Sequence, residues 1–315
     1  MKRLFIALAV SGFSALALVL ALNDPNRAAG SERGTVASGI GELTIDGRDA
    51  HVEVFVAVAP GRDAAEEVRA ELIQRGARPL KPSEFVASGL VWNEFSDDNA
   101  TNDFVVQYYN PGSPSTAPDP TAGGGATALL NTHATWTDVP TSKFAFAYGG
   151  TTTRCPSLVA ECPGGQVFDG FNDVAWMDLG RCSIGRCTLG VTWFATTDPD
   201  EGDMALNTRV SWRTNGSDYD VESVMLHENG HVLGLGHSSI TQAVMYAYYG
   251  GLRRSLHQDD IDGVTSLYPE DGGAPTSTPT NTPAPTNTAT ATSTPDPNAT
   301  PTANCPPGWR RQGRC

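Results

Sequence analysis

Three histidines and a glutamate with metal-site chemistry stand close together in the sequence: His227, Glu228, His231 and His237. His227 and His231 are four residues apart, so on a helix they share one face, with Cα atoms roughly 6 Å apart along the axis. That spacing lets two imidazoles reach one tetrahedral zinc ion. Glu228 lies about 100° further round the helix. Its carboxylate can therefore accept a proton from water without becoming a ligand.

Gly234 explains how a third ligand reaches the same ion. The chain must leave the helix and double back after His231, and glycine tolerates the positive φ that such a turn needs. His237 then arrives as the third ligand. Three protein ligands leave one coordination position for water, which is typical of a catalytic zinc site. A helix with incidental histidines would instead bury three imidazoles and a carboxylate, at several kcal/mol unless they are paired.

The pattern H-E-x-x-H-x-x-G-x-x-H resembles that of the metzincin metallopeptidases. Ser238 after the third histidine and the segment 243–246 are similar to the matrixin branch and its Met-turn. Residues 256–268 are similar to the closing helix of matrixin catalytic domains, and residues 136–140 to the end of their first helix. The resemblance spans residues 105–269. It implies an α+β fold with a twisted five-stranded mixed sheet, mostly parallel with an antiparallel edge strand, three helices, and a cleft crossed by zinc.

The resemblance also implies a function and a cleft. The expected reaction is hydrolysis of peptide bonds by zinc-activated water, with Glu228 as general base and a protein or peptide as substrate. Met245 would form an apolar floor beneath the imidazoles. An extended substrate would add to an edge strand, which we place at 189–191 with Leu189 and Gly190. Residues between Tyr246 and His257 would wall a side-chain pocket.

Departures from the family pattern limit the expectations. Matrixins of animals cap their zinc with a propeptide cysteine, whereas no cysteine precedes Cys155 here, so a thiol switch is unsupported. Only three histidines lie outside the motif, and they do not cluster, so we predict a single zinc. Calcium could bind acidic loop residues, although a solvated acidic turn is equally consistent with them. These residues are Asp198, Asp200, Glu201 and Asp203.

The element pattern places the motif inside an α+β domain. Alternating apolar residues or β-branched runs predict strands at 51–59, 104–109, 144–148, 173–179, 189–196 and 204–212. Good helix formers predict helices at 63–75 and 122–136, and acidic residues near 259 suit the start of a last helix. The Ser-x-x-Asp pattern from Ser217 to Asp220 predicts that the motif helix begins near Ser217. That helix is apolar around most of its circumference, so it should be buried.

The chain divides into five parts. A basic leader and an apolar run within residues 1–30 are typical of a secretory signal, although the run also reaches the lower limit for a membrane anchor. Residues 31–86 form a small strand–helix unit, for which a propeptide, a support layer and a simple packing extension are all open. Residues 87–270 form the peptidase domain. Residues 271–304 are a Thr/Pro-rich linker, and 305–315 a basic tail closed by a disulfide.

Charge and cysteine content restrict partners and compartment. The net charge of −14 disfavours nucleic acid and anionic membrane surfaces. Six cysteines in an exported chain indicate disulfides. Sequence proximity favours the pairs Cys155–Cys162, Cys182–Cys187 and Cys305–Cys315, against a four-cysteine zinc site made from the first four. We therefore expect a secreted monomer of the extracellular matrix or cell surface, with no membrane insertion once the signal is removed.

Two other classes of function compete with the peptidase. One is a zinc-bearing adhesion or binding module that no longer cleaves. The intact Glu228 argues against it, because binding alone needs no base beside the metal. The other is a zinc hydrolase of non-peptide esters or amides, which the motif by itself does not exclude.

Overall fold

The computed structural model describes residues 34–80, 92–95, 103–112, 124–156, 167–180, 182, 185–195, 201–214 and 219–270. The predictions for the signal, the linker and the basic tail concern residues outside these ranges. None of the helices in the described ranges combines the length and the apolar character that a bilayer crossing requires.

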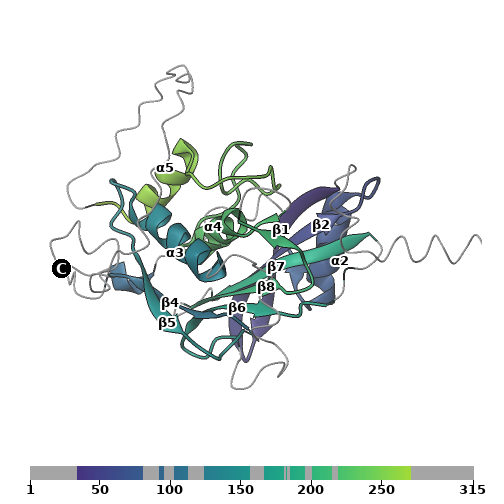
Figure 1. Ribbon diagram of the computed structural model, residues 1–315, viewed down its shortest axis with the longest axis horizontal. Helices are drawn as coiled ribbons and strands as arrows, with labels where there is room; N and C mark the ends of the chain where they lie inside the picture. The colour runs from purple at the N-terminus through teal and green to yellow at the C-terminus, as the bar shows by residue number, and fades with distance from the viewer. Residues whose placement is uncertain are drawn as a thin grey trace, which may run out of the picture.

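One mixed sheet organises the protein (Figure 1). Its eight strands lie in the order β3-β1-β2-β7-β8-β6-β4-β5. Five of them come from the predicted peptidase domain: β4 (Val105–Asn110), β5 (Phe146–Thr151), β6 (Asn172–Met177), β7 (Arg186–Ala195) and β8 (Gly202–Asn207). Neighbours among β8, β6, β4 and β5 are parallel, and β7 runs antiparallel to β8.

Three N-terminal strands extend this sheet, so it has eight strands where five were expected. They are β1 (Thr35–Ile45), β2 (Arg48–Val58) and β3 (Arg78–Pro79), all paired antiparallel. β2 pairs with β7 from Ala50 opposite Ala195 to Val58 opposite Arg186. The strand β7 is therefore interior, whereas the sequence placed 189–191 at an edge.

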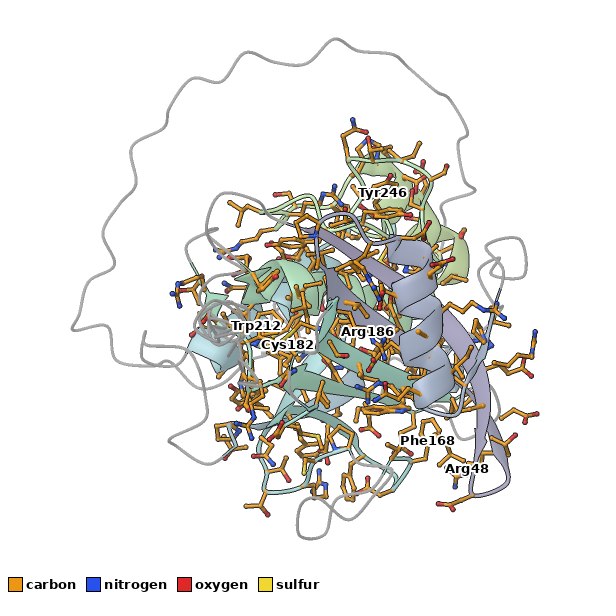
Figure 2. The ribbon with its side chains drawn as sticks, turned by 90° about the vertical axis from the view of Figure 1, so that its right-hand side faces the viewer. Arg48, Phe168, Cys182, Arg186, Trp212 and Tyr246 are labelled. Carbon is orange, nitrogen blue, oxygen red and sulfur yellow. A yellow bond between two sulfur atoms is a disulfide. The ribbon has the colours of Figure 1, made fainter. Side chains whose placement is uncertain are left out.

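The described ranges contain four α-helices, and the first three of them pack directly against the sheet. They are α2 (Ala64–Gln74), α3 (Gly124–Thr137), α4 (Val221–Val232) and α5 (Gln258–Leu267). A short 3-10 turn, η2 (Asn93–Phe95), and a two-stranded ribbon of β9 (Trp212–Arg213) and β10 (Tyr219–Asp220) complete the described elements. The helices α3 and α4 pack side by side, and α2 lies against the N-terminal strands (Figures 1 and 2).

Strand alternation divides the core between the faces, because successive side chains of a strand point to opposite sides. On β8, Ala205 joins the cluster that contains α2, whereas Met204 and Leu206 join the cluster that contains α3 and α4. A third cluster, which includes Trp136 of α3 and Tyr268 just after α5, anchors the far side of α4. The motif helix is thereby enclosed by apolar packing.

The motif helix begins later than the Ser217 pattern predicts. Asp220 is its N-cap, with extended backbone and a carboxylate that accepts a hydrogen bond from Ser223 N at 2.9 Å. Asp220 also lies in β10, which pairs with β9, so the chain is still extended at that point. Ser217 lies outside the described residues. The guanidinium of Arg254 pairs with Asp220 and further fixes the start of α4.

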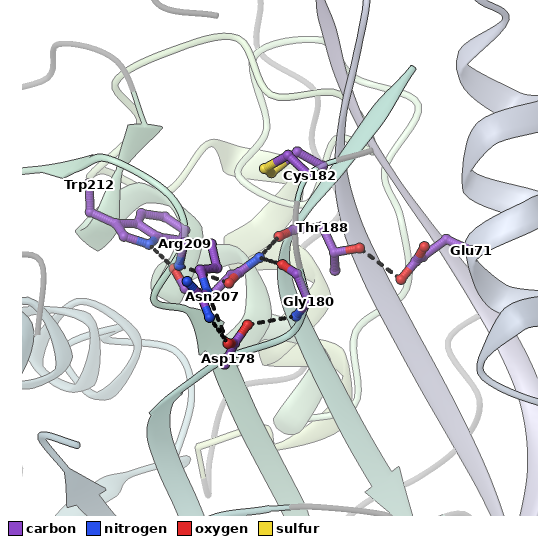
Figure 3. The surroundings of a disulfide bond; sticks show 9 residues. Glu71, Asp178, Gly180, Cys182, Thr188, Asn207, Arg209 and Trp212 are labelled. Atoms are coloured by element: carbon purple, nitrogen blue, oxygen red, sulfur yellow. Dashed lines mark hydrogen bonds and ion pairs between the residues drawn. A yellow bond between two sulfur atoms is a disulfide. The ribbon is translucent and has the colours of Figure 1, made fainter. Parts of the chain in front are cut away.

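Cysteines follow the disulfide prediction where the structure describes them. Cys182 is bonded to Cys187 at the start of β7 (Figure 3). This pairing removes two thiols from the alternative four-cysteine zinc site. Cys155 is disulfide-bonded as well. Cys162, Cys305 and Cys315 lie outside the described residues.

Candidate metal centre

The helix α4 presents two of the predicted ligands from one buried face. His227 and His231 are 3% and 0% exposed. Their Nδ1 atoms donate to backbone carbonyls, His227 to Val244 O at 2.7 Å and His231 to Leu235 O at 2.8 Å. Each such bond fixes the ring orientation and leaves Nε2 as an unprotonated acceptor, the form in which imidazole binds a metal.

Gly234 brings the third histidine to the other two. Its φ of +104° lies in the region that favours glycine. The turn is closed by Leu235 N, which donates to Gly230 O at 2.9 Å as α4 ends. The chain then runs back, and the ring centroid of His237 lies 4.9 Å from that of His231 and 5.4 Å from that of His227.

The donor atoms converge on one point. The Nε2 atoms of His227 and His231 are 3.2 Å apart. In their neutral forms both rings donate through Nδ1 and carry a lone pair on Nε2, so the two Nε2 atoms can bind one cation together. One ligand atom from each of His227, His231, His237 and Glu53 lies within 4.8 Å of the others. Imidazole nitrogens and a carboxylate oxygen are ordinary zinc ligands, so this donor set fits zinc.

Glu53 is the member that sequence reasoning missed. It comes from β2, 174 residues before His227, and its side chain is fully buried. Oε1 lies 2.8 Å from His237 Nε2 and 3.3 Å from His227 Nε2, and Oε2 lies 2.6 Å from His231 Nε2. The available signal was a lone carboxylate in the middle of the Val-rich strand predicted at 51–59, and a polar residue is ordinary in such an alternating pattern.

The electrostatics of the cluster follow from burial and from this carboxylate. Burial alone would raise the pKa of Glu53, but the three imidazoles hold that pKa well below its ordinary value. Burial opposes protonation of His227, yet the nearby Glu53 charge raises its pKa. For His237 burial prevails and lowers the pKa to about 4.

Glu228 lies on α4 beside the cluster, where the sequence placed it. Its side chain is fully buried, and Oε2 accepts a hydrogen bond from Thr192 Oγ1 at 2.5 Å. Burial, and next the charge of Glu53, raise the pKa of Glu228 well above its ordinary value. Thr192 of β7 was missed by sequence reasoning, because nothing local marks the threonine that orients a carboxylate 36 residues away.

A buried polar network holds α4 in register with its neighbours. Gln107 of β4 donates through Nε2 to Asn229 Oδ1 at 3.0 Å, and Asn229 Nδ2 donates to Thr132 Oγ1 at 2.8 Å. His133 Nε2 donates to Gln107 Oε1 at 2.7 Å. Burial lowers the pKa of His133 to about 3, so the ring is neutral at physiological pH. The network thus fixes the helix that carries both histidines.

Met245 lies under the motif helix. A Cβ atom added to Gly230 would lie 2.1 Å from Met245 Sδ, so the thioether packs directly on the helix backbone next to His231. The carboxylate of Asp260 accepts hydrogen bonds from Val244 N at 2.8 Å and Met245 N at 3.1 Å. Asp260, in the first turn of α5, therefore fixes the loop whose Val244 carbonyl orients His227.

The predicted cleft residues lie around the cluster in different roles. Gly190 faces Glu228, because a Cβ atom there would lie 3.7 Å from Oε1. Leu189 is fully buried in the core, which does not suit contact with a substrate side chain. Tyr246 lines a small cavity that also includes His227, Val244 and Tyr249.

The residues proposed for calcium are only partly described. Asp198 and Asp200 lie outside the described residues. Glu201 and Asp203 are buried, and their carboxylates accept backbone hydrogen bonds, Glu201 from Gly170 N at 3.0 Å and Asp203 from Asp173 N at 2.9 Å. A calcium site here stays a prediction.

A twisted mixed sheet, a helix carrying two histidines and a glycine turn to a third define the metzincin class of metal site. Comparison with known families agrees with this geometry. The matrixin peptidase family model matches residues 184–269, which include β7, α4 and the three histidines. Residues 184–269 are therefore matrixin-like, and matrixins are a branch of the metzincins.

Several curated proteins are similar to part of the chain. Karilysin of Tannerella forsythia is 47% identical over 67 residues, which cover 21% of this chain and 14% of that protein. The hatching enzyme of Paracentrotus lividus is 40% identical over 89 residues, 27% of this chain and 15% of that protein. Metalloendoproteinase 1 of Glycine max is 54% identical over 80 residues, which cover 22% of this chain and 26% of that protein. The chain thus spans a small fraction of each relative's length.

Proposed function

We propose that this protein is a secreted endopeptidase that depends on one zinc ion held by His227, His231 and His237. The observation that carries the proposal is the convergence of these three imidazoles beside the buried carboxylate of Glu228. The names of the relatives, among them metalloendoproteinases, support a peptide or protein as substrate. The disulfide Cys182–Cys187 supports an oxidising compartment and hence export.

A zinc ion at this site would supply Lewis-acid chemistry, polarising the scissile carbonyl and making water a nucleophile at neutral pH. The protein's own residues do the rest. Glu228 would take the proton from the attacking water, because its carboxylate lies on α4 between the two histidines of that helix and next to the cluster. Thr192 holds the carboxylate in place, and the backbone bonds of His227 and His231 orient their rings. We further propose that the protein acts as a monomer and that calcium binds at the acidic loop.

Replacement of Glu228 tests this function. Glu228→Ala should lower hydrolysis of casein or a quenched peptide by about 10²- to 10⁴-fold, the usual contribution of a general base. Bound zinc, measured by atomic absorption, should not change, because Glu228 is not a ligand in this scheme. Glu222→Gln is the matched control, since Glu222 lies on the same helix and bonds to Asn131 instead. Equal cleavage by Glu228→Ala and the parent would rule out the role of Glu228.

Chelation separates the peptidase from its rivals. We expect o-phenanthroline to abolish peptide cleavage and added zinc to restore it. Turnover of esters without peptide cleavage would favour the non-peptide hydrolase, and zinc binding without any turnover would favour the binding module.

A further inference from the structure

The N-terminal hairpin of β1 and β2 occupies the place that an extended substrate needs. The backbone of β2 pairs with β7 on both sides of the site, including Val54 opposite Val191 and Phe55 opposite Gly190. An extended peptide that adds to a strand uses these same backbone groups. Because they already bond to β2, no peptide can add to β7 while the hairpin is in place.

The hairpin also places a carboxylate where the three imidazoles meet. Both oxygens of Glu53 lie within 3.3 Å of an imidazole Nε2, and each of the three rings has one such contact. A fully buried carboxylate is unfavourable by several kcal/mol unless a cation compensates it. A metal held by the three imidazoles would be that cation, and Glu53 would then take the coordination position that the reaction needs for water.

Phe55 follows Glu53 by two residues on the same face of β2. Its ring centroid lies 5.5 Å from that of His227 and 6.2 Å from that of Tyr249. It is 2% exposed and lines the small cavity beside Tyr246. An aromatic side chain of the protein itself therefore lies at this cavity next to the metal ligands.

The first strand of the hairpin, β1, bonds to the opposite wall of the cleft. Ser38 N donates to Ala247 O at 2.8 Å, and Tyr249 N donates to Val36 O at 3.0 Å. Ser38 Oγ also lies 2.9 Å from His237 Nε2. The hairpin thus spans the cleft from β7 on one side to the segment 247–249 on the other.

The helix α2 fastens the hairpin to the start of β7. Arg186 Nε donates to Glu71 Oε2 at 2.9 Å, Arg186 Nη1 donates to Glu67 Oε2 at 3.2 Å, and Thr188 Oγ1 donates to Glu71 Oε1 at 2.7 Å. Figure 3 shows the Thr188 contact, and Figure 2 shows Arg186 beside α2. These bonds hold α2 and the hairpin against β7. If the hairpin moved away, the charged groups would be exposed to water.

We propose that residues 35–79 are a built-in pseudosubstrate, in which Glu53 is the fourth metal ligand and Phe55 occupies the side-chain pocket. The inference rests on the proposed zinc site. In this proposal the protein is latent while the hairpin lies in the cleft, and it gains activity when the hairpin leaves. It also assigns the pocket beside Tyr246 a preference for a substrate with a large aromatic side chain.

Cobalt(II) in place of zinc gives a test that does not depend on activity. The full chain with Glu228→Ala, which should not cleave itself, is loaded with cobalt, and its visible absorption is followed as acetohydroxamate is added. We expect acetohydroxamate to cause no spectral change in this parent. In the double variant that also carries Glu53→Ala we expect a clear shift, because the alanine opens a coordination position. The zinc affinity of the Glu53→Ala variant should fall at least about tenfold, which is the low end of the loss seen when a metal site loses a partner group. Glu42→Ala, on β1 of the same hairpin, should behave as the parent does.

Phe55→Ala gives a second, independent variant. It should raise access of acetohydroxamate to cobalt by emptying the pocket. The control is Val54→Ala, because Val54 points to the opposite face and packs in the cluster with α2. If Glu53→Ala and Phe55→Ala respond to acetohydroxamate as their parent does, the pseudosubstrate is ruled out.

Activity then separates this inference from the proposed function. With Glu228 intact and chain length checked by mass spectrometry, Glu53→Ala should cleave a quenched peptide at least about tenfold faster than the parent, because an attached occupant competes at millimolar effective concentration. Spectral opening without peptide cleavage supports the hairpin as an occupant of the metal site and contradicts the endopeptidase. Cleavage that is equal in the unprocessed parent and in Glu53→Ala overturns latency while leaving the endopeptidase in place.

Discussion

A buried carboxylate outside the cluster of three histidines and Glu53 sets a pH dependence of stability. Glu201 is 3% exposed, and burial raises its pKa to about 6. Between its ordinary pKa and about 6 the folded chain binds more protons than the unfolded chain, so this group lowers stability as pH rises through that window. Glu201→Gln should therefore raise the free energy of unfolding by up to about 2 kcal/mol above pH 6 and have little effect near pH 4. Urea unfolding at both pH values measures the difference.

The control for this prediction is Glu42→Gln. Glu42 forms an exposed pair with Arg78, and such pairs contribute at most about 1 kcal/mol. Its replacement should change stability by a similar small amount at both pH values. A gain from Glu201→Gln that is as large near pH 4 as above pH 6 would contradict the assignment to burial of the charge.

At the scale of elements, β1 can pack against α2 only because it carries small residues. A Cβ atom at Gly39 would lie 2.5 Å from Val68 Cγ1, closer than real Cβ contacts allow. Gly39→Ala should therefore lower the free energy of unfolding by about 1–3 kcal/mol through overpacking. Val68→Ala removes the clashing methyl, so the double variant should be less destabilised than the sum of the two single variants. Urea unfolding of all four chains gives the coupling, and strictly additive effects would exclude the clash as the cause.

The glycines of β1 also explain why sequence reasoning missed this strand. Gly39 and Gly41 dilute the apolar alternation of residues 35–45, and glycine has low strand propensity on its own. The strand exists because its neighbours β2 and α2 require close backbone approach, which is a tertiary effect. By contrast α4 was predicted from its own residues, because the apolar circumference and the histidine spacing are both local. Only the first residue of the helix was misplaced.

At the scale of the whole molecule, the sequence could predict the three histidines but not what lies opposite them. Their convergence depends on eleven residues, one helix turn and one glycine, all within reach of spacing rules. Glu53 reaches the same point through the pairing of β2 with β7, and strand order is not encoded in any local pattern. The matrixin family model matches residues 184–269 only, so it gives no information about this hairpin.

Metal at this point would join three separate parts of the molecule: β2 through Glu53, α4 through His227 and His231, and the following loop through His237. A ligand that binds only the folded chain stabilises it by about 4 kcal/mol when present at a thousand times its dissociation constant. Chelation should therefore lower the Tm, and added zinc should restore it. Magnesium should not, because it prefers a shell of oxygen ligands.

The zinc-dependent part of the Tm also shows whether the N-terminal unit takes part. Glu53→Ala removes the bond between β2 and the metal, so we expect a smaller rise of Tm on zinc addition than in the parent. Differential scanning calorimetry of apo and zinc-loaded chains measures both rises, with Glu42→Ala as the control. If chelation leaves the Tm of the parent unchanged, the imidazoles do not hold a metal in the folded protein. If zinc raises the Tm of Glu53→Ala as much as that of the parent, the metal binds the catalytic domain without joining the hairpin to it.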